Sequence, residues 1–206
     1  MRLILASASP ARLATLRSAG IEPEVRVSGV DEDAVLSDAD VRDGDVVVRL
    51  LARAKAEAVA RTGDLPGDAV VLGCDSLLEL DGERHGKPRD ADEAMRRWQR
   101  MRGNSGVLHT GHWLIDLRAG PDAPGVGATS STVVHFADLS DAEIDAYVAT
   151  GEPLAVAGAF TIDGLGGPFV TGISGDHHGV VGLSLPLLRD LLGSVGINIP
   201  ELWGTR

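Results

Sequence analysis

The first twenty residues contain a short apolar run, a polar turn and a helix start, and this pattern limits how the chain can fold. Residues 2–6 are apolar enough to form a buried strand. Ser9 can cap the helix that follows, with Pro10 at its first position, and Gly20 can end it. A strand that turns tightly into a helix presents backbone N–H groups to an anion. This unit is typical of α/β folds that place a binding site at such a turn.

Alternating apolar runs and helical spacing continue along the rest of the chain. The Asp81-Gly82 pair predicts a hairpin turn, and Ser140 with Glu143 predicts a capping box. We expect an acidic turn at Asp31-Glu32-Asp33 and loops at residues 118–128 and 174–179. The spacing predicts helices at 46–61, 90–102, 140–150 and 185–192, and strands at 24–27, 69–74, 76–80, 107–117, 129–136 and 169–173.

Length and charge restrict the classes of function. The 206 residues suffice for one domain with a substantial core, or for two small lobes that share a cleft, and we expect one folding unit. The net charge of -11 disfavours nucleic acid polymers and anionic membranes as partners. Aromatic residues make up only 3%, so platforms that stack bases are scarce. A small polyanion could still bind where a few basic side chains converge.

The single cysteine, Cys74, excludes an intrachain disulfide and a cysteine-rich zinc site. The apolar run at the start is too short for a signal peptide, and no later stretch is long enough to cross a bilayer. We therefore expect a cytoplasmic protein that does not contact a membrane.

Taken one at a time, most of the candidate site residues have an ordinary structural explanation. Ser9 with Arg12 fits a helix cap followed by a solvated arginine, and Lys55 fits the wet face of its helix. Lys87 fits the tail of a hairpin. Asp75 is different, because it follows an apolar run, and burying a carboxylate without a partner is costly.

Taken together, these residues favour phosphoryl chemistry. The hydroxyls of Ser7 and Ser9 at a helix start, with three basic side chains, would form a cradle for phosphates. Glu32 and Asp75 offer the oxygen ligands that Mg²⁺ prefers. The three basic residues of this cradle are Arg12, Lys55 and Lys87.

Motifs along nearly the whole chain resemble those of the Maf-like nucleotide pyrophosphatases, and they occur in the same order. Several motifs in one order are a far stronger signal than any single one. They are S-A-S-P-A-R at 7–12, A-R-A-K-A at 52–56, L-G-C-D-S at 72–76, D-G-E-R-H-G-K-P-R-D at 81–90, L-H-T-G-H at 108–112, L-S-D-A-E-I-D-A-Y-V at 139–148, G-E-P-L-A-V-A-G-A-F at 151–160 and V-V-G-L-S-L-P-L at 180–187.

The resemblance implies an elongated α/β fold in which a mixed sheet is flanked by helices. Its two lobes would surround a central cleft within one domain, 1–206, related to the inosine triphosphatase-like pyrophosphatases and often found as a homodimer. The activity implied is hydrolysis of a nucleoside triphosphate to the monophosphate and pyrophosphate with Mg²⁺ or Mn²⁺, which could remove non-standard nucleotides.

The resemblance also assigns roles to individual residues. Asp75 matches the proposed catalytic acid of the family, which also binds the metal, and Glu32 matches an acidic position linked to metal or water. The positions that match the phosphate-binding residues are Ser7, Ser9, Arg12, Lys55 and Lys87.

Four departures from the family pattern concern the substrate side of the site. Ala11 stands where a second arginine is usual, and Ala155-Val156 replaces an aspartate-lysine pair. Phe160 stands for a tyrosine, and Asp163 for a glutamine. We expect Asp163 near the nucleotide or metal; the alternative is a turn aspartate. The sequence does not determine which base is preferred.

Two other functions compete with this interpretation. Asp176-His177-His178 matches the D-H-H signature of another metal-dependent phosphoesterase family, but adjacent histidines on a strand cannot face one metal, and we expect a polar turn there. A nucleotide-binding regulator of cell division without turnover would need the same phosphate cradle.

Overall fold

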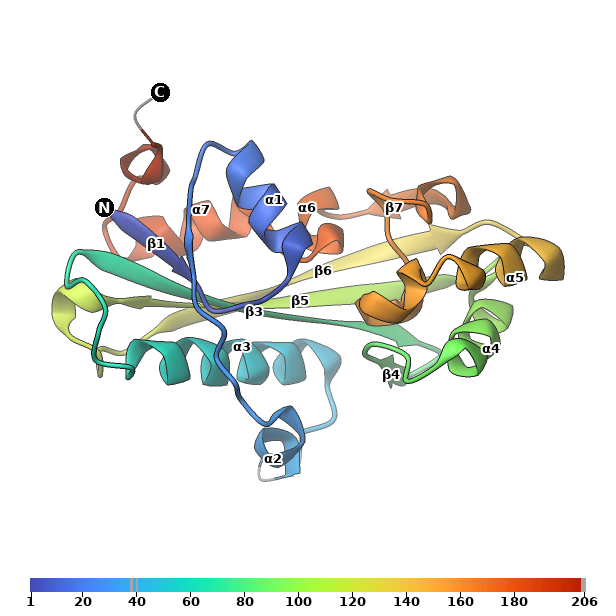
Figure 1. Cartoon of the computed structure of the whole chain (residues 1–206), viewed down its shortest axis with the longest axis horizontal. Helices are drawn as coiled ribbons and strands as arrows, with labels where there is room; N and C mark the ends of the chain where they lie inside the picture. Colours follow the sequence, from blue (N-terminus) through green and yellow to red (C-terminus); the bar gives the residue numbers. More distant parts are fainter. Residues whose placement is uncertain (38, 40, 205–206) are drawn as a thin grey trace.

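The computed structural model describes residues 1–37, 39 and 41–204. Within these residues the chain forms one mixed sheet of seven strands with helices on both faces (Figure 1). This architecture confirms the predicted fold class, an α/β protein with a mixed sheet. The division into two lobes within a single domain stays a prediction.

The sheet is parallel at one end and antiparallel over the rest. The order is β2-β1-β3-β5-β6-β7, and β4 also pairs with β3. β1 is parallel to both neighbours, whereas all other pairs are antiparallel. The strands are β1 (Arg2–Leu5), β2 (Glu24–Val25), β3 (Ala69–Leu80), β4 (Glu83–His85), β5 (Ser105–Asp116), β6 (Val126–Phe136) and β7 (Val170–Ser174).

One edge of β3 is open in its middle. β1 pairs with residues 69–72 of β3, and β4 pairs with residues 78–80. In the described part of the chain, residues 73–77 therefore have β5 on one side and no strand on the other. Asp75 lies in this gap, just beyond the carboxyl end of β1, where α/β sheets commonly bind their ligands.

Helices cover the sheet in distinct places. α3 lies along one face, α1, α6 and α7 cover the other, and α4 and α5 lie together at the far end (Figure 1). No helix among the described residues is both long and apolar enough to span a membrane. The helices are α1 (Pro10–Ser18), α2 (Glu32–Ser37), α3 (Gly44–Ala60), α4 (Ala91–Met101), α5 (Asp141–Ala149), α6 (His177–Val181) and α7 (Leu185–Ser194), with 3-10 turns η1 (Leu117–Ala119), η2 (Glu152–Ala155), η3 (Ala157–Ala159), η4 (Gly167–Phe169) and η5 (Ile199–Leu202).

The backbone of α3 packs directly on the sheet at two glycines. A Cβ on Gly73 would overlap the carbonyl oxygen of Ala52, and one on Gly111 would overlap that of Val48. Gly73 and Asp75 are two residues apart and share a face of β3. The glycines therefore let α3 approach closely enough for its side chains to reach Asp75.

Different apolar clusters support the two ends of the sheet. Trp98 is fully buried at the α4 end and forms edge-to-face contacts with Phe136 and Tyr147. At the opposite end, Leu16 of α1 and Leu188 of α7 pack in the cluster that contains Leu72. β3 runs through both clusters, so it connects the two ends rigidly.

Most of the predicted elements are confirmed, and the differences have local causes. Ser9 caps α1, and Ser140 with Glu143 forms the predicted capping box. The prediction of an acidic turn at residues 31–33 is wrong, because Glu32 begins the short helix α2. The prediction of a loop at 174–179 is also partly wrong, because α6 begins at His177. Asp176 accepts hydrogen bonds from two backbone N–H groups and caps this helix.

We predict that Gly73→Ala destabilises the protein, because the new methyl group must displace α3. The free energy of unfolding should fall by about 1–3 kcal/mol, the usual cost of overpacking. Urea unfolding measures this change. Gly67→Ala is the control, since a Cβ there meets no atom within 4 Å. An unchanged stability for Gly73→Ala would contradict the close packing of α3.

Candidate active site

The open edge of β3 gathers four of the predicted site residues. The Lys55 ammonium on α3 lies 2.6 Å from Asp75 Oδ1 and 2.6 Å from Glu32 Oε1. The Lys55 and Asp75 side chains are 12% and 13% exposed, whereas Glu32 is 51% exposed. Arg12 reaches the same strand from the other face, through the carbonyl of Cys74 at 2.8 Å. Side chains from separate segments thus converge on residues 74–76 of β3 from both of its faces.

The environment of Asp75 makes its carboxylate more basic. Burial raises the pKa of Asp75 above its ordinary value, and the charges of Lys55 and Arg12 oppose this rise only in part. Lys55 binds Oδ1, and no described group donates a hydrogen bond to Oδ2. Asp75 therefore has one free oxygen that can accept a proton.

Arg12 is buried and bonded mainly to neutral acceptors. Its guanidinium donates to Gly182 O at 2.8 Å, Ser7 Oγ at 2.9 Å, Cys74 O at 2.8 Å and Ser76 Oγ at 3.1 Å. These bonds use four of its five N–H groups. No described carboxylate lies within ion-pair distance of Arg12. A buried cation without an acidic partner is costly unless an anion compensates for it.

A chain of hydroxyls fixes Arg12 against the sheet. Thr110 Oγ1 donates to Gly179 O at 2.8 Å. Its contact with Ser76 Oγ at 2.9 Å must then have Ser76 as the donor, since a hydroxyl has one proton. Ser76 in turn accepts from Arg12. The donor and acceptor of each hydrogen bond from Arg12 to Gly179 O are therefore fixed, and these bonds hold the guanidinium in one orientation.

Both serines of the N-terminal turn keep a free hydroxyl proton. Ser7 Oγ accepts from Arg12 and from the backbone N–H of Ser9, and Ser9 Oγ accepts from the backbone N–H of Arg12. Neither hydroxyl donates to any group in the described chain. Two O–H donors beside a buried arginine suit the oxygens of a phosphate.

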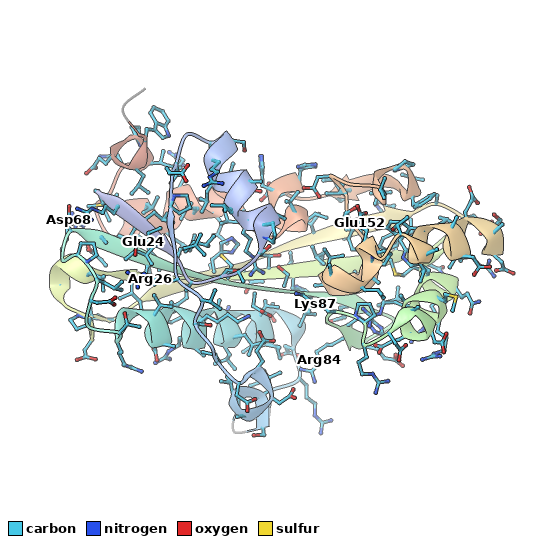
Figure 2. The ribbon with its side chains drawn as sticks, viewed as in Figure 1. Glu24, Arg26, Asp68, Arg84, Lys87 and Glu152 are labelled. Carbon is cyan, nitrogen blue, oxygen red and sulfur yellow. The ribbon has the colours of Figure 1, made fainter. Side chains whose placement is uncertain are left out.

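Lys87 approaches the gap from the side of β4. His85 pairs with Leu78, and antiparallel pairing carries the chain beyond His85 toward the level of Asp75. Figure 2 labels Lys87 in the loop after β4, near the middle of the molecule. The structure shows no contact between Lys87 and the Lys55 cluster, which consists of Lys55, Asp75 and Glu32. The exposed side chain of Lys87 has no ion-pair partner among the described residues.

Asp163 is exposed and also lies outside the Lys55 cluster. Its loop is held by Glu152 (labelled in Figure 2), whose carboxylate accepts from Thr161 Oγ1, Tyr147 Oη and two backbone N–H groups of the loop. Burial opposes the charge of Glu152, yet these donors keep its pKa below the ordinary value. Glu152 and Tyr147 organise this loop, and sequence reasoning did not single them out.

The carboxylates at the gap could hold a divalent metal only if phosphate oxygens of a bound substrate also coordinated it. No group of three or more metal-binding side chains occurs in residues 1–37, 39 and 41–204. Glu32 and Asp75, however, both contact one ammonium, so their carboxylates lie close together. Mg²⁺ is often held by one or two carboxylates plus phosphate oxygens and water. Lys55 cancels only one of the two carboxylate charges, so this pair of oxygen donors fits a divalent ion that phosphate oxygens and water would help to hold.

His112 is a buried residue of this region that the sequence indicated only through a family motif. Its Nδ1 lies 3.1 Å from Thr110 O, and its Nε2 accepts from Ser184 N, the N-cap of α7, at 2.9 Å. The ring is therefore neutral with the proton on Nδ1. Burial lowers the pKa of His112 to about 4, and the charge of Arg12 adds to the effect.

The residues of the alternative D-H-H signature lie at the start of α6. Asp176 caps α6 through the backbone N–H groups of His178 and Gly179, and no metal-binding cluster forms among the described residues. Asp176 therefore stabilises the start of α6, and Gly179 of this helix accepts the hydrogen bond from Thr110 Oγ1.

Comparison with known proteins gives consistent matches over nearly the whole chain. The profile of the family described as "Maf-like protein" matches residues 2–195. A protein named nucleoside triphosphate pyrophosphatase from Salinispora tropica is 58% identical, over 98% of this chain and 88% of the relative. Proteins with the same name from Leifsonia xyli and Streptomyces coelicolor are 56% and 55% identical, over 98% of this chain and 97% and 94% of theirs.

Solved structures give weaker matches. A nucleoside-triphosphatase / dITP/XTP pyrophosphatase from Mycobacterium abscessus is 15% identical, over 95% of both chains, with a TM-score of 0.41. The Ham1 protein of Staphylococcus aureus is 18% identical, over 67% of this chain and 73% of the other, with a TM-score of 0.40. Similarity at this level supports no conclusion about this chain.

We predict that His112 makes the fold sensitive to acid. Its pKa falls from 6.5 to about 4 on folding, so the folded state favours the neutral ring. This stabilisation is complete above pH 6.5 and is lost as the pH falls toward 4, by up to roughly 3 kcal/mol. Urea unfolding between pH 7 and pH 4 should show a smaller loss for His112→Gln than for wild type.

His177→Gln is the control for this measurement, because the side chain of His177 is exposed. It should lose stability with acid as the wild type does. An identical pH dependence in wild type and His112→Gln would refute the role of His112.

Proposed function

The chain belongs to the Maf-like protein family, and on that premise we propose that this nucleoside triphosphate pyrophosphatase cuts its substrate between the α- and β-phosphates. The observation that carries the proposal is the meeting of Asp75, Lys55, Glu32 and Arg12 at the open edge of β3. This polar cluster combines a carboxylate of raised basicity with cations that suit phosphates.

In the proposed reaction, Asp75 acts as the general base. Its free Oδ2 takes a proton from a water molecule, whose oxygen forms a bond to the α-phosphorus. The bond from that phosphorus to the oxygen bridging to the β-phosphate breaks, and pyrophosphate leaves with the electron pair. The raised pKa of Asp75 brings its basicity closer to neutral pH, where a general base is most effective.

The basic residues bind the phosphates and stabilise the leaving group. Arg12 has one uncommitted N–H group, and Ser7 and Ser9 each have a free hydroxyl proton. Donors that are already oriented cost little reorganisation as charge develops on the oxygens. Lys87 would reach the same phosphates from the opposite side of the gap.

Lys55 has a second role in this proposal. Two of the three donors on its ammonium contact Asp75 and Glu32, which leaves one for a phosphate oxygen. Lys55 therefore holds both carboxylates in place and links them to the substrate.

Glu32 and Asp75 would hold a divalent ion such as Mg²⁺ or Mn²⁺. When bound, the ion supplies Lewis-acid polarisation and neutralises phosphate charge. A preference for non-standard nucleotides and a homodimer stay predictions from the resemblance, and a cytoplasmic location stays a prediction from the sequence.

We predict that Asp75→Asn abolishes turnover without unfolding the protein. Loss of a general base should lower kcat by at least about 10²-fold. The measurement is pyrophosphate release from a panel of nucleoside triphosphates, including deaminated and methylated bases. Asp116→Asn is the control, because Asp116 is also a strand aspartate with a basic partner, Arg118, but it lies on β5 beside Val70, near the start of β3. Wild-type turnover by folded Asp75→Asn would exclude the proposed base, and saturable binding without product in wild type would favour a regulator.

We also predict that removal of divalent ions with a chelator abolishes pyrophosphate release, and that Mg²⁺ or Mn²⁺ restores it. Glu32→Gln should raise the metal concentration needed for half-maximal activity by about 10-fold or more, because it removes a charged ligand. Glu57→Gln is the matched control, because this half-buried glutamate of α3 pairs with Arg53 and Arg61 rather than with Lys55. Full activity in the chelator would argue against a metal-dependent reaction.

A further inference from the structure

Arg97 of α4 is a buried arginine whose charged end contacts the loop that carries Lys87. The residue is 4% exposed. Its NH1 donates to Gly86 O at 2.6 Å, and its NH2 donates to Glu93 Oε1 at 2.8 Å. Gly86 directly precedes Lys87 in the sequence. Arg97 therefore binds the peptide group that leads into Lys87.

The Gly86 carbonyl is held from a second side as well. The backbone N–H of Gly158, in η3, donates to the same oxygen at 3.1 Å. Gly158 has a positive φ of 75° and packs so closely on β3 that a Cβ there would lie 2.9 Å from Leu78 Cβ. On the other side of Lys87, Pro88 is buried. The short loop is thus fixed between α4, η3 and β3, while the Lys87 side chain remains exposed.

Stability alone does not explain Arg97. Its Nε is buried and has no hydrogen-bond partner among the described residues. Glu93 already has Arg89 as a partner at 2.9 Å, so it does not depend on Arg97 for neutralisation. Replacing a buried ion pair with apolar groups is often neutral or stabilising. Burying the Arg97 guanidinium costs free energy, and Glu93 does not need it as a partner. We therefore look for a role of Arg97 in positioning the group that it binds, the Gly86 carbonyl.

We propose that Arg97 is a positioning residue that orients Lys87 toward the substrate phosphates through the Gly86 carbonyl. This inference rests on the proposed function, in which Lys87 binds those phosphates. Lysine is a compact charge on a flexible stem, so the direction of its side chain depends on how firmly its backbone is held. A displacement of about 1 Å in a group that orients substrate can cost up to 10²-fold in rate.

The test is a double-mutant cycle with Arg97→Met and Lys87→Ala, measured by steady-state kinetics of pyrophosphate release. Met retains the apolar volume of the arginine stem but cannot bind Gly86 O. Arg97→Met should raise KM and lower kcat/KM by about 10-fold, because the backbone that carries Lys87 would no longer be held in one position. In the Lys87→Ala background the same change should alter kcat/KM by less than about 2-fold, because residues that act through one another are not additive.

Arg102→Met is the matched control. Arg102 caps the same helix and also contacts a carbonyl and a carboxylate, Leu139 O and Asp141, but these belong to the segment leading into α5. It should leave KM unchanged. If Arg97→Met alone does not fold, Arg97→Met combined with Glu93→Gln removes both charges of this ion pair together, and thermal unfolding checks that this variant is native.

Three outcomes separate the inference from the proposed function. A loss for Arg97→Met that disappears in the Lys87→Ala background supports the positioning role. A loss of the same size in both backgrounds, or a folded Arg97→Met with wild-type KM while Lys87→Ala is impaired, overturns it. Wild-type kinetics for Lys87→Ala would instead remove Lys87 from the proposed phosphate site, and the role of Arg97 with it.

Discussion

The contact of the α3 backbone with the sheet determines most of what this protein can do. Gly73 and Gly111 leave no side chain between helix and strands, so α3 lies closer than ordinary packing allows. Lys55, one turn beyond the contact at Ala52, then reaches the carboxylate of Asp75. With a larger residue at either glycine, the helix would move outward and the ammonium would lose its partner. The site is therefore a consequence of how two backbones pack.

Electrostatic balance explains why the same place suits a polyanion. Lys55 is shared by Asp75 and Glu32, so this trio carries one negative charge, which the buried Arg12 offsets. Neutral acceptors surround Arg12, and neutral hydroxyls orient it without reducing its charge. Such an arrangement costs stability, because burial penalises each ion. Proteins retain that kind of cost mainly where a ligand gains from it.

The two sides of the gap are held by different means. On the β1 side, side chains bond to one another and to β3, as the contacts of Arg12 and Lys55 show. On the β4 side, a backbone group is fixed instead, because Arg97 and the Gly158 N–H both bind the Gly86 carbonyl. The exposed side chain of Lys87 therefore extends from a rigid base. In the proposed function, a triphosphate bound in the gap would contact both sides.

The sequence alone determined the elements whose signals are local. A capping residue acts on N–H groups within three positions, so Ser140 and Ser9 could be recognised at once, and an apolar run ending in Asp75 indicated a carboxylate at a strand. The motifs named Arg12, Lys55, Glu32 and Asp75 but not how these residues contact one another, and Lys87 and Asp163, named with them, make no contact with this group. Only the tertiary structure decided that Arg12 bonds to Gly182 O, 170 residues away, and that His112 accepts from Ser184 N. Such contacts depend on where the sheet places each backbone group, and no short-range pattern encodes that.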